Sequence, residues 1–86
     1  MDTTAFTQAA ERVKQLKNRP SDGELLQLYG LFKQATAGDV SGDKPGLFDL
    51  KGRKKFEAWA KLKGTGKDQA AADYIKLVDG LQKSQA

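Results

Sequence analysis

Residues 25–39 read LLQLYGLFKQATAGD, and this stretch does most to decide the fold. Its leucines recur at helical spacing, while Tyr29 and Lys33 stand one turn apart beside that apolar stripe. A tyrosine and a lysine at this spacing can share one phosphate group. Lys51, Lys55 and Trp59 follow at successive four-residue steps, so a second helix is expected to aim cations at the same place.

The residues on either side of this stretch predict where its helix begins and ends. Ser21 and Glu24 form a capping-box pattern, in which each side chain satisfies a free backbone donor of the first turn. Gly38 can adopt the left-handed conformation in which helices often end, so the helix is expected to stop near Ala37.

The N-terminal part of the chain predicts an earlier amphipathic helix. It is expected from about Thr4 to Lys17, and Arg19-Pro20 closes it because proline disfavours helix in the residue before it. Its apolar face recurs at three- and four-residue steps and consists of Phe6, Ala9, Ala10, Val13 and Leu16.

After residue 37 the composition shifts to Gly, Asp, Ser and Pro, which predicts a long ordered connection from Gly38 to Phe48. Positive φ angles are expected at Gly38, Gly42 and Gly46. Asp49 is expected to cap a third helix that ends at Gly64. Thr65 and Asp68 are expected to cap a fourth helix, whose apolar face is Ala71, Tyr74, Ile75, Val78 and Leu81.

These patterns predict an all-α fold with a single domain over residues 1–86, since no alternating strand pattern competes with them. The first and fourth helices have the cleanest apolar stripes and are expected to pack as a pair. The second and third helices mix aromatic and basic residues, so this pair is the better candidate for a binding surface.

Composition excludes several classes of function. The chain has no cysteine and no histidine, which argues against a disulfide, redox chemistry, a zinc site and any cofactor. The stretch Met1 to Phe6 lacks the pattern of a secretory signal, and no apolar run approaches the roughly 20 residues that span a bilayer. A soluble cytoplasmic protein without stable membrane insertion is expected. The formal charge of +4 suggests an anionic partner, although charge for solubility alone explains it equally well.

The sequence resembles the acyl-CoA-binding protein family, also called diazepam-binding inhibitors, over essentially its whole length. The matching residues keep the order and spacing of that family: Leu28-Tyr29-Gly30, Lys33-Gln34-Ala35-Thr36, Gly38-Asp39, Pro45-Gly46, Asp49, Gly52, Lys55, Ala58-Trp59, Leu62-Lys63-Gly64 and Tyr74-Ile75. The resemblance implies a four-helix up-down-down-up bundle. It also implies a monomeric carrier and pool former for medium- to long-chain fatty acyl-CoA that performs no chemistry on its ligand and meets acyl-CoA-using enzymes transiently.

The resemblance also implies ligand contacts. Tyr29, Lys33 and Lys55 match the positions that hold the 3′-phosphate of the CoA head group, and the stretch from Tyr29 through Gly30, Leu31 and Phe32 to Lys33 matches the adenine wall. Lys14 and Tyr74 match further head-group contacts, and Lys51 matches a more variable one. Two residues depart from the family pattern, since Phe32 stands where tyrosine is common and Phe56 where tryptophan is usual.

Several residues have a structural interpretation beside the functional one. An isolated lysine on an amphipathic helix is usually solvated, and this remains the interpretation of Arg53 and Lys54. Tyr74 continues the core stripe of its helix, so its role is divided between packing and the pocket edge. Leu25 and Leu26 are candidates for the acyl groove and equally for the core.

Three other functions compete with acyl-CoA binding. A thioesterase would need a nucleophile and a base, whereas the chain offers no histidine or cysteine and only three serines. A nucleic-acid-binding helix would rest on Lys51 to Lys55, which lack the broad basic stripe of duplex binders, and no nucleic acid is expected. A relative with a decayed site could act as a protein-interaction module, although Tyr29, Lys33, Lys55 and Tyr74 are all retained.

Overall fold

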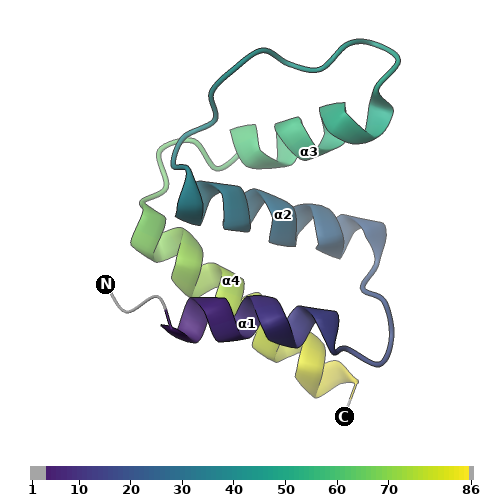
Figure 1. The fold of residues 1–86 in the computed structure, drawn as a ribbon, viewed down its shortest axis with the longest axis vertical. Helices are drawn as coiled ribbons and strands as arrows, with labels where there is room; N and C mark the ends of the chain where they lie inside the picture. Colours follow the sequence, from purple (N-terminus) through teal and green to yellow (C-terminus); the bar gives the residue numbers. More distant parts are fainter. Residues whose placement is uncertain (1–3, 86) are drawn as a thin grey trace.

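The computed structural model describes residues 4–85. It contains the helices α1 (Thr4–Lys14), α2 (Asp22–Thr36), α3 (Leu50–Ala60) and α4 (Lys67–Ser84), and no strand occurs within those residues. Figure 1 shows α1 and α4 running in one direction while α2 and α3 run in the other. The predicted all-α, up-down-down-up arrangement is therefore confirmed.

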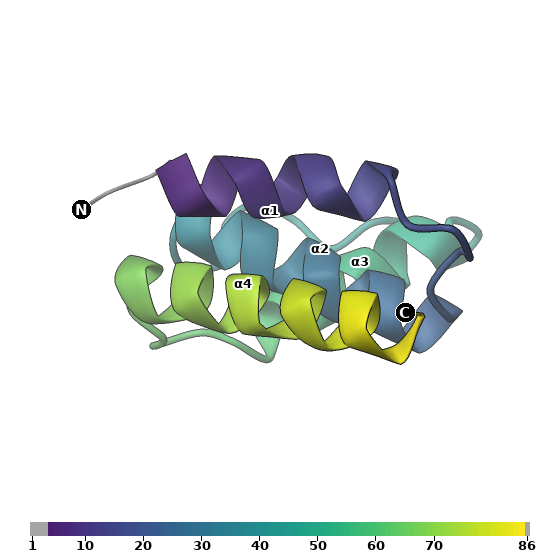
Figure 2. The same cartoon turned by 90° about the horizontal axis from the view of Figure 1, so that it is seen from below.

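The four helices do not share contacts equally. α2 lies in the middle and touches both α3 and α4, whereas α1 packs on α4 and α3 packs on α2 alone. The second view shows α1 and α4 running in the same direction (Figure 2), and the two helices are in contact. The predicted pairing of the first and fourth helices is confirmed, and the buried core joins α1, α2 and α4 through Phe6, Ala9, Leu28, Ala71, Tyr74, Val78 and Leu81.

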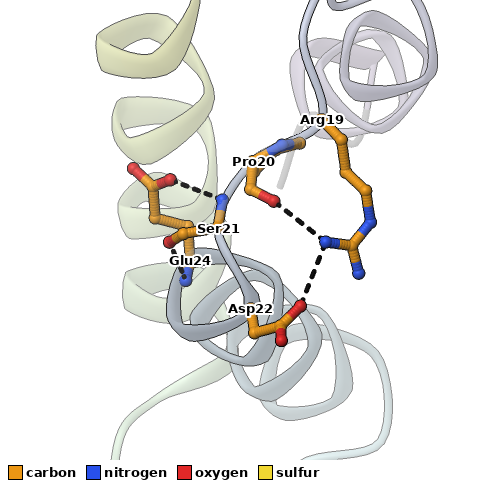
Figure 3. A network of polar contacts seen from close by, with 5 residues as sticks. All are labelled: Arg19, Pro20, Ser21, Asp22 and Glu24. Carbon is orange, nitrogen blue, oxygen red and sulfur yellow. Dashed lines mark hydrogen bonds and ion pairs between the residues drawn. The ribbon is translucent and has the colours of Figure 1, made fainter.

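The N-terminus of α2 carries the predicted capping box. Ser21 Oγ accepts a hydrogen bond from the Glu24 N–H at 3.2 Å, and Glu24 Oε1 accepts one from the Ser21 N–H at 2.9 Å. Beside it, Arg19 donates to the Asp22 carboxylate at 3.0 Å (Figure 3). The entry into α2 is therefore fixed by local contacts that the sequence predicts.

Two helices end earlier than predicted. α1 stops at Lys14 instead of Lys17, because the N–H groups of Gln15 and Leu16 bond to carbonyls three residues back and tighten the chain into a turn. α3 stops at Ala60 instead of Gly64 for the same reason, with Leu62 donating to the Trp59 carbonyl at 3.0 Å. Gly64 has a φ of 93° and ends this turn.

Two local predictions are wrong. Thr65 and Asp68 do not cap α4, since Gly66 occupies the cap position without a side-chain hydrogen bond and the Thr65 carbonyl accepts from Gln34 instead. Gly46 does not have a positive φ angle, whereas Gly38 and Gly42 do, at 87° and 86°. The predicted cap of α3 is confirmed, because Asp49 Oδ1 accepts from the Gly52 N–H at 3.0 Å.

No helix within residues 4–85 is long and apolar enough to cross a membrane. Residues Met1 to Thr3, which begin the stretch that lacks a signal pattern, lie outside the described residues.

Candidate functional site

A close approach of α2 and α3 builds the centre of the candidate site. Gly30 is buried, and a Cβ atom placed on it would lie 2.7 Å from the Ala58 carbonyl oxygen. Only glycine therefore allows the two backbones to meet at this point. The contact brings side chains of both helices to one face of the pair.

Two lysines lie over aromatic rings across this contact. Lys55 Nζ is 5.5 Å from the centroid of the Tyr29 ring, and Lys33 Nζ is 4.9 Å from the Trp59 ring centroid. Each helix contributes one aromatic ring and one cation, four residues apart. The two lysine–ring pairs therefore lie one helical turn apart along the contact between α2 and α3. We call Tyr29, Lys33, Lys55 and Trp59 the aromatic-cation cluster.

The two lysines of this cluster are not neutralised by an acidic side chain among residues 4–85. The ion pairs within residues 4–85 involve Arg12, Lys14, Arg19 and Lys44, and neither Lys33 nor Lys55 has an acidic partner there. An aromatic ring attracts an ammonium group through its quadrupole but does not neutralise it. The cluster therefore presents one ammonium group from α2 and one from α3, each over a ring of the other helix, which together are suited to an anion of high charge density.

A polar network fixes the C-terminal end of the cluster. The Trp59 indole N–H donates to the Gly38 carbonyl at 2.8 Å, and Asp39 Oδ1 accepts from the Gly64 N–H at 2.8 Å and from Gln34 Nε2 at 2.9 Å. The pKa of Asp39 lies below its usual value because these two donors, Gly64 first and Gln34 second, stabilise the carboxylate. We call Gln34, Gly38, Asp39, Trp59 and Gly64 the polar lock.

The polar lock was not predicted from the sequence. Gln34 stands in an amphipathic helix, where a glutamine usually faces solvent, yet it is fully buried and its Nε2 also donates to the Thr65 carbonyl at 2.7 Å. The only sequence signal is its position four residues after Gly30, which places it near the α3 side of α2.

Three aromatic rings from different helices meet beside the cluster. Phe32 stacks on Phe6 with ring centroids 5.5 Å apart, and Tyr74 lies 5.0 Å from Phe6 and 6.1 Å from Phe32. Tyr74 is buried, and burial raises the pKa of its phenol above the ordinary value. Phe32 is 39% exposed, so part of its ring is open to solvent.

The structure separates the residues of the predicted adenine wall. Gly30 is buried against α3, whereas Leu31 lies 200° around the helix from Lys33 and lines a cleft on the other side of α2. Phe32 alone among the three middle residues presents an open surface next to Tyr29. Of the five consecutive residues of the predicted wall, Tyr29, Phe32 and Lys33 therefore stay candidates for an adenine contact, whereas Gly30 and Leu31 do not.

A cleft lies between α2, α3 and the side of α4 that carries Asp73. It encloses about 790 Å³, and its apolar lining comes from Leu26, Leu31, Ala58 and Leu62. None of the four residues of the aromatic-cation cluster lines it. Leu26 is one of its lining residues, whereas the other predicted groove residue, Leu25, packs against the core.

The remaining predicted contacts are peripheral to the cluster. Lys14 is exposed near the end of α1 and lies 3.5 Å from Glu11. Lys51 is exposed on the first turn of α3, one turn before Lys55. Phe56, the second departure from the family pattern, is half-buried in the same helix. Within residues 4–85 no group of three or more side chains could hold a metal ion.

Comparison with known proteins identifies the family. The family model described as Acyl CoA binding protein matches residues 3–78. The chain belongs to the acyl-CoA-binding protein family. The acyl-CoA-binding protein homolog of Drosophila melanogaster is 56% identical over 81 residues, which cover 94% of each chain. Homolog 1 of Caenorhabditis elegans is 54% identical over 79 residues, which cover 92% of each chain.

Solved structures of this family share the fold. The crystal structure of Oryza sativa acyl-CoA-binding protein 2 superposes with a TM-score of 0.89 at 44% identity, covering 93% of this chain and 89% of that one. The solution structure of the yeast acyl coenzyme A binding protein gives a TM-score of 0.76 at 45% identity, covering 98% of each chain. Membership of the acyl-CoA-binding protein family supports acyl-CoA as the ligand class and places the chain among binding proteins.

Proposed function

We propose that this chain binds medium- to long-chain fatty acyl-CoA thioesters without covalent chemistry, as a carrier and pool former. The observation that carries the proposal is the aromatic-cation cluster, where Lys33 and Lys55 each lie over a ring of the other helix and have no acidic partner within residues 4–85. Tyr29, Lys33 and Lys55 hold the 3′-phosphate of the head group. A phosphomonoester carries nearly two charges at neutral pH, which matches two ammonium groups and a phenol donor.

The rest of the head group extends from this phosphate over the neighbouring aromatic surface. The exposed part of Phe32 offers an aromatic surface for the adenine, and Tyr74 packs against Phe32 with ring centroids 6.1 Å apart. Lys14 and Lys51 supply further positive charge at the periphery. Their side chains are exposed, so each contributes less binding free energy than the half-buried Lys33.

The acyl chain supplies most of the affinity and the 3′-phosphate most of the selectivity. Burial of methylene groups contributes up to about 0.8 kcal/mol each, so the affinity rises with chain length, and free CoA binds weakly and with strong salt dependence. Palmitate lacks the phosphate and binds poorly. We assign Leu26 to the acyl contact in preference to Leu25, because Leu26 borders an open cleft and Leu25 packs into the core.

The carrier works as a cytoplasmic monomer that exchanges its ligand with acyl-CoA-using enzymes by transient contact. It leaves the thioester intact, since the site holds lysines and aromatic rings but no nucleophile next to a base. Chromatography of a saturated complex should therefore show no release of CoA over the background hydrolysis rate.

Titration calorimetry of ligand-stripped protein tests the site. Palmitoyl-CoA should bind one-to-one, and dephospho-palmitoyl-CoA, which lacks the 3′-phosphate, should bind more weakly. Lys33→Ala should lower the affinity for palmitoyl-CoA by roughly 10- to 100-fold, because it removes one charge-assisted hydrogen bond. The same substitution should change the affinity for the dephospho ligand far less.

Lys76→Ala is the matched control, since Lys76 is an exposed lysine of α4 outside the cluster. It should leave palmitoyl-CoA binding unchanged. Absence of palmitoyl-CoA binding in the wild-type protein would refute the carrier function and favour a protein-interaction module. Equal loss of affinity for both ligands in Lys33→Ala would refute the assignment of Lys33 to the 3′-phosphate.

A further inference from the structure

The turn before α3 exposes large apolar side chains. Within residues 4–85 the exposed large apolar residues are Phe32, Leu47, Phe48 and Leu50, so three of the four fall within four consecutive positions. Phe48 is fully exposed, while Leu47 is 75% and Leu50 67% exposed. We call Leu47, Phe48 and Leu50 the apolar tip. Unlike Phe32, they belong neither to the core nor to the residues packed against it.

The backbone of the apolar tip is ordered by its own hydrogen bonds. The Asp49 N–H donates to the Gly46 carbonyl at 3.1 Å, which makes Leu47 and Phe48 the two central residues of a turn. Asp49 then caps α3 through the Gly52 N–H. The central positions of turns usually carry glycine, proline or short polar residues. Two large apolar residues at these positions therefore stabilise neither the turn nor the core.

Positive charge surrounds the apolar tip. Residues 44–55 contain five lysines or arginines and one acid, Asp49, while the rest of the chain holds ten of each sign. This segment therefore carries the whole formal charge of +4. Lys44 pairs with Glu57 at 2.9 Å, whereas no acidic partner lies within ion-pair distance of Lys51, Arg53, Lys54 or Lys55 among residues 4–85.

We propose that the apolar tip and the cations beside it dock this protein on an anionic lipid surface. Leu47, Phe48 and Leu50 enter the interfacial layer, and the neighbouring cations meet the lipid head groups, which is a peripheral contact and not a membrane span. An acidic protein surface would match the charge, but it would need a pocket shaped to a projecting turn. A lipid surface accommodates a convex apolar tip of any shape.

The position of the segment permits this contact. Figure 1 shows the connection between α2 and α3 arching along the outer side of α3, away from α1 and α4. A planar surface can therefore reach the apolar tip without obstruction from the bundle core. Lys51 and Lys55 belong both to this segment and to the proposed head-group site, so docking would bring that site close to the layer into which acyl-CoA partitions.

Vesicle co-sedimentation tests the proposal with phosphatidylcholine vesicles that contain or lack phosphatidylserine. The wild-type protein should partition onto the anionic vesicles and detach as the salt concentration rises. Phe48→Ser should lower this partition by about tenfold, whereas Phe48→Leu should retain it because it keeps an apolar side chain. Arg53→Gln should lower it about fivefold, and Lys76→Gln, which removes one charge from α4, should change it little.

A second measurement distinguishes this inference from the proposed function. Phe48→Ser should leave the affinity for palmitoyl-CoA in solution unchanged, since Phe48 lies outside the head-group site. In Phe48→Trp, the added fluorescence should shift to the blue on anionic vesicles and be quenched by brominated lipid, measured against the Trp59 background of the wild-type protein. Failure to bind anionic vesicles would overturn the inference and leave an acidic protein as the partner. Binding that Phe48→Ser and Arg53→Gln both leave intact would also overturn it.

Discussion

At the scale of single residues, the site depends on one glycine as much as on its lysines. Gly30→Ala would place a Cβ 2.7 Å from the Ala58 carbonyl oxygen, so α2 and α3 must move apart. We expect this substitution to lower the free energy of unfolding by about 1 to 3 kcal/mol. It should also weaken palmitoyl-CoA binding, because the same movement separates Tyr29 from Lys55. Urea denaturation and calorimetry measure the two effects.

Gly80→Ala is the matched control for this substitution. Gly80 lies in α4 with a negative φ angle, and a Cβ atom there would meet nothing within 4 Å. Alanine is a better helix former, so Gly80→Ala should raise the free energy of unfolding by about 0.5 to 1 kcal/mol. Similar effects at both positions would contradict the role assigned to the Gly30 contact.

That Tyr29 and Lys33 share one helix face, and Lys55 and Trp59 another, could be predicted because helical spacing determines which side chains lie together, although Trp59 was expected as core or groove wall and not as part of the site. Tyr29 and Lys33 on one helix and Lys55 and Trp59 on the other are each four residues apart. The burial of Gly30 and the placement of Leu31 on the opposite side could not be predicted in this way. They depend on which side of α2 meets α3, and that is set by packing between helices.

At the scale of secondary-structure elements, the predictions succeeded where a cap is local and failed where a long-range contact competes. The caps by Ser21 and Asp49 bond to residues three positions away. The predicted cap of α4 by Thr65 failed, because Gly66 stands at the cap position and Thr65 lies one residue before it, where its carbonyl accepts a hydrogen bond from the buried Gln34 side chain of α2. A contact across 31 residues of sequence leaves no local pattern to read.

The polar lock between these elements should make stability depend on acid pH. The pKa of Asp39 is lowered in the folded protein from its ordinary value of 3.8, mainly by the Gly64 N–H and then by Gln34. The unfolded chain therefore binds more protons in this range, and the free energy of unfolding should fall as the pH drops below about 4. Asp39→Asn should flatten this fall, as followed by urea denaturation across pH.

Glu57 provides a comparison, since hydrogen bonding and charge from Lys44 also lower its pKa in the folded state. Glu57→Gln should remove a separate part of the fall in the free energy of unfolding at acid pH. The double variant Asp39→Asn/Glu57→Gln should remove both parts. Asp39 lies in the connection after α2 and Glu57 lies in α3, and the two carboxylates share no hydrogen-bond or ion-pair partner, so their effects should add. If the free energy of unfolding fell equally at acid pH in Asp39→Asn and in the wild-type protein, the polar lock would be excluded as the cause of that fall.

At the scale of the whole molecule, charge and apolar surface are distributed unevenly over an otherwise balanced bundle. α1 and α4 pair through the core, while Lys33 of α2 and Lys55 of α3, which have no acidic partner among residues 4–85, belong to the candidate head-group site. Such a small domain has a modest stability, so a ligand that binds only the folded state should stabilise it measurably.

Thermal unfolding with ligand tests this coupling between the site and the whole fold. Palmitoyl-CoA at a free concentration about 100 times its Kd should add about 2.7 kcal/mol, which raises the Tm by roughly 10 to 20 °C for a domain of this size. Lys33→Ala at the same ligand concentration should show a smaller shift. The ligand must stay below its critical micelle concentration, and palmitate serves as the control for a detergent effect. An equal shift with palmitate would mean that the acyl chain acts without the head-group site, and the aromatic-cation cluster would then have no part in binding.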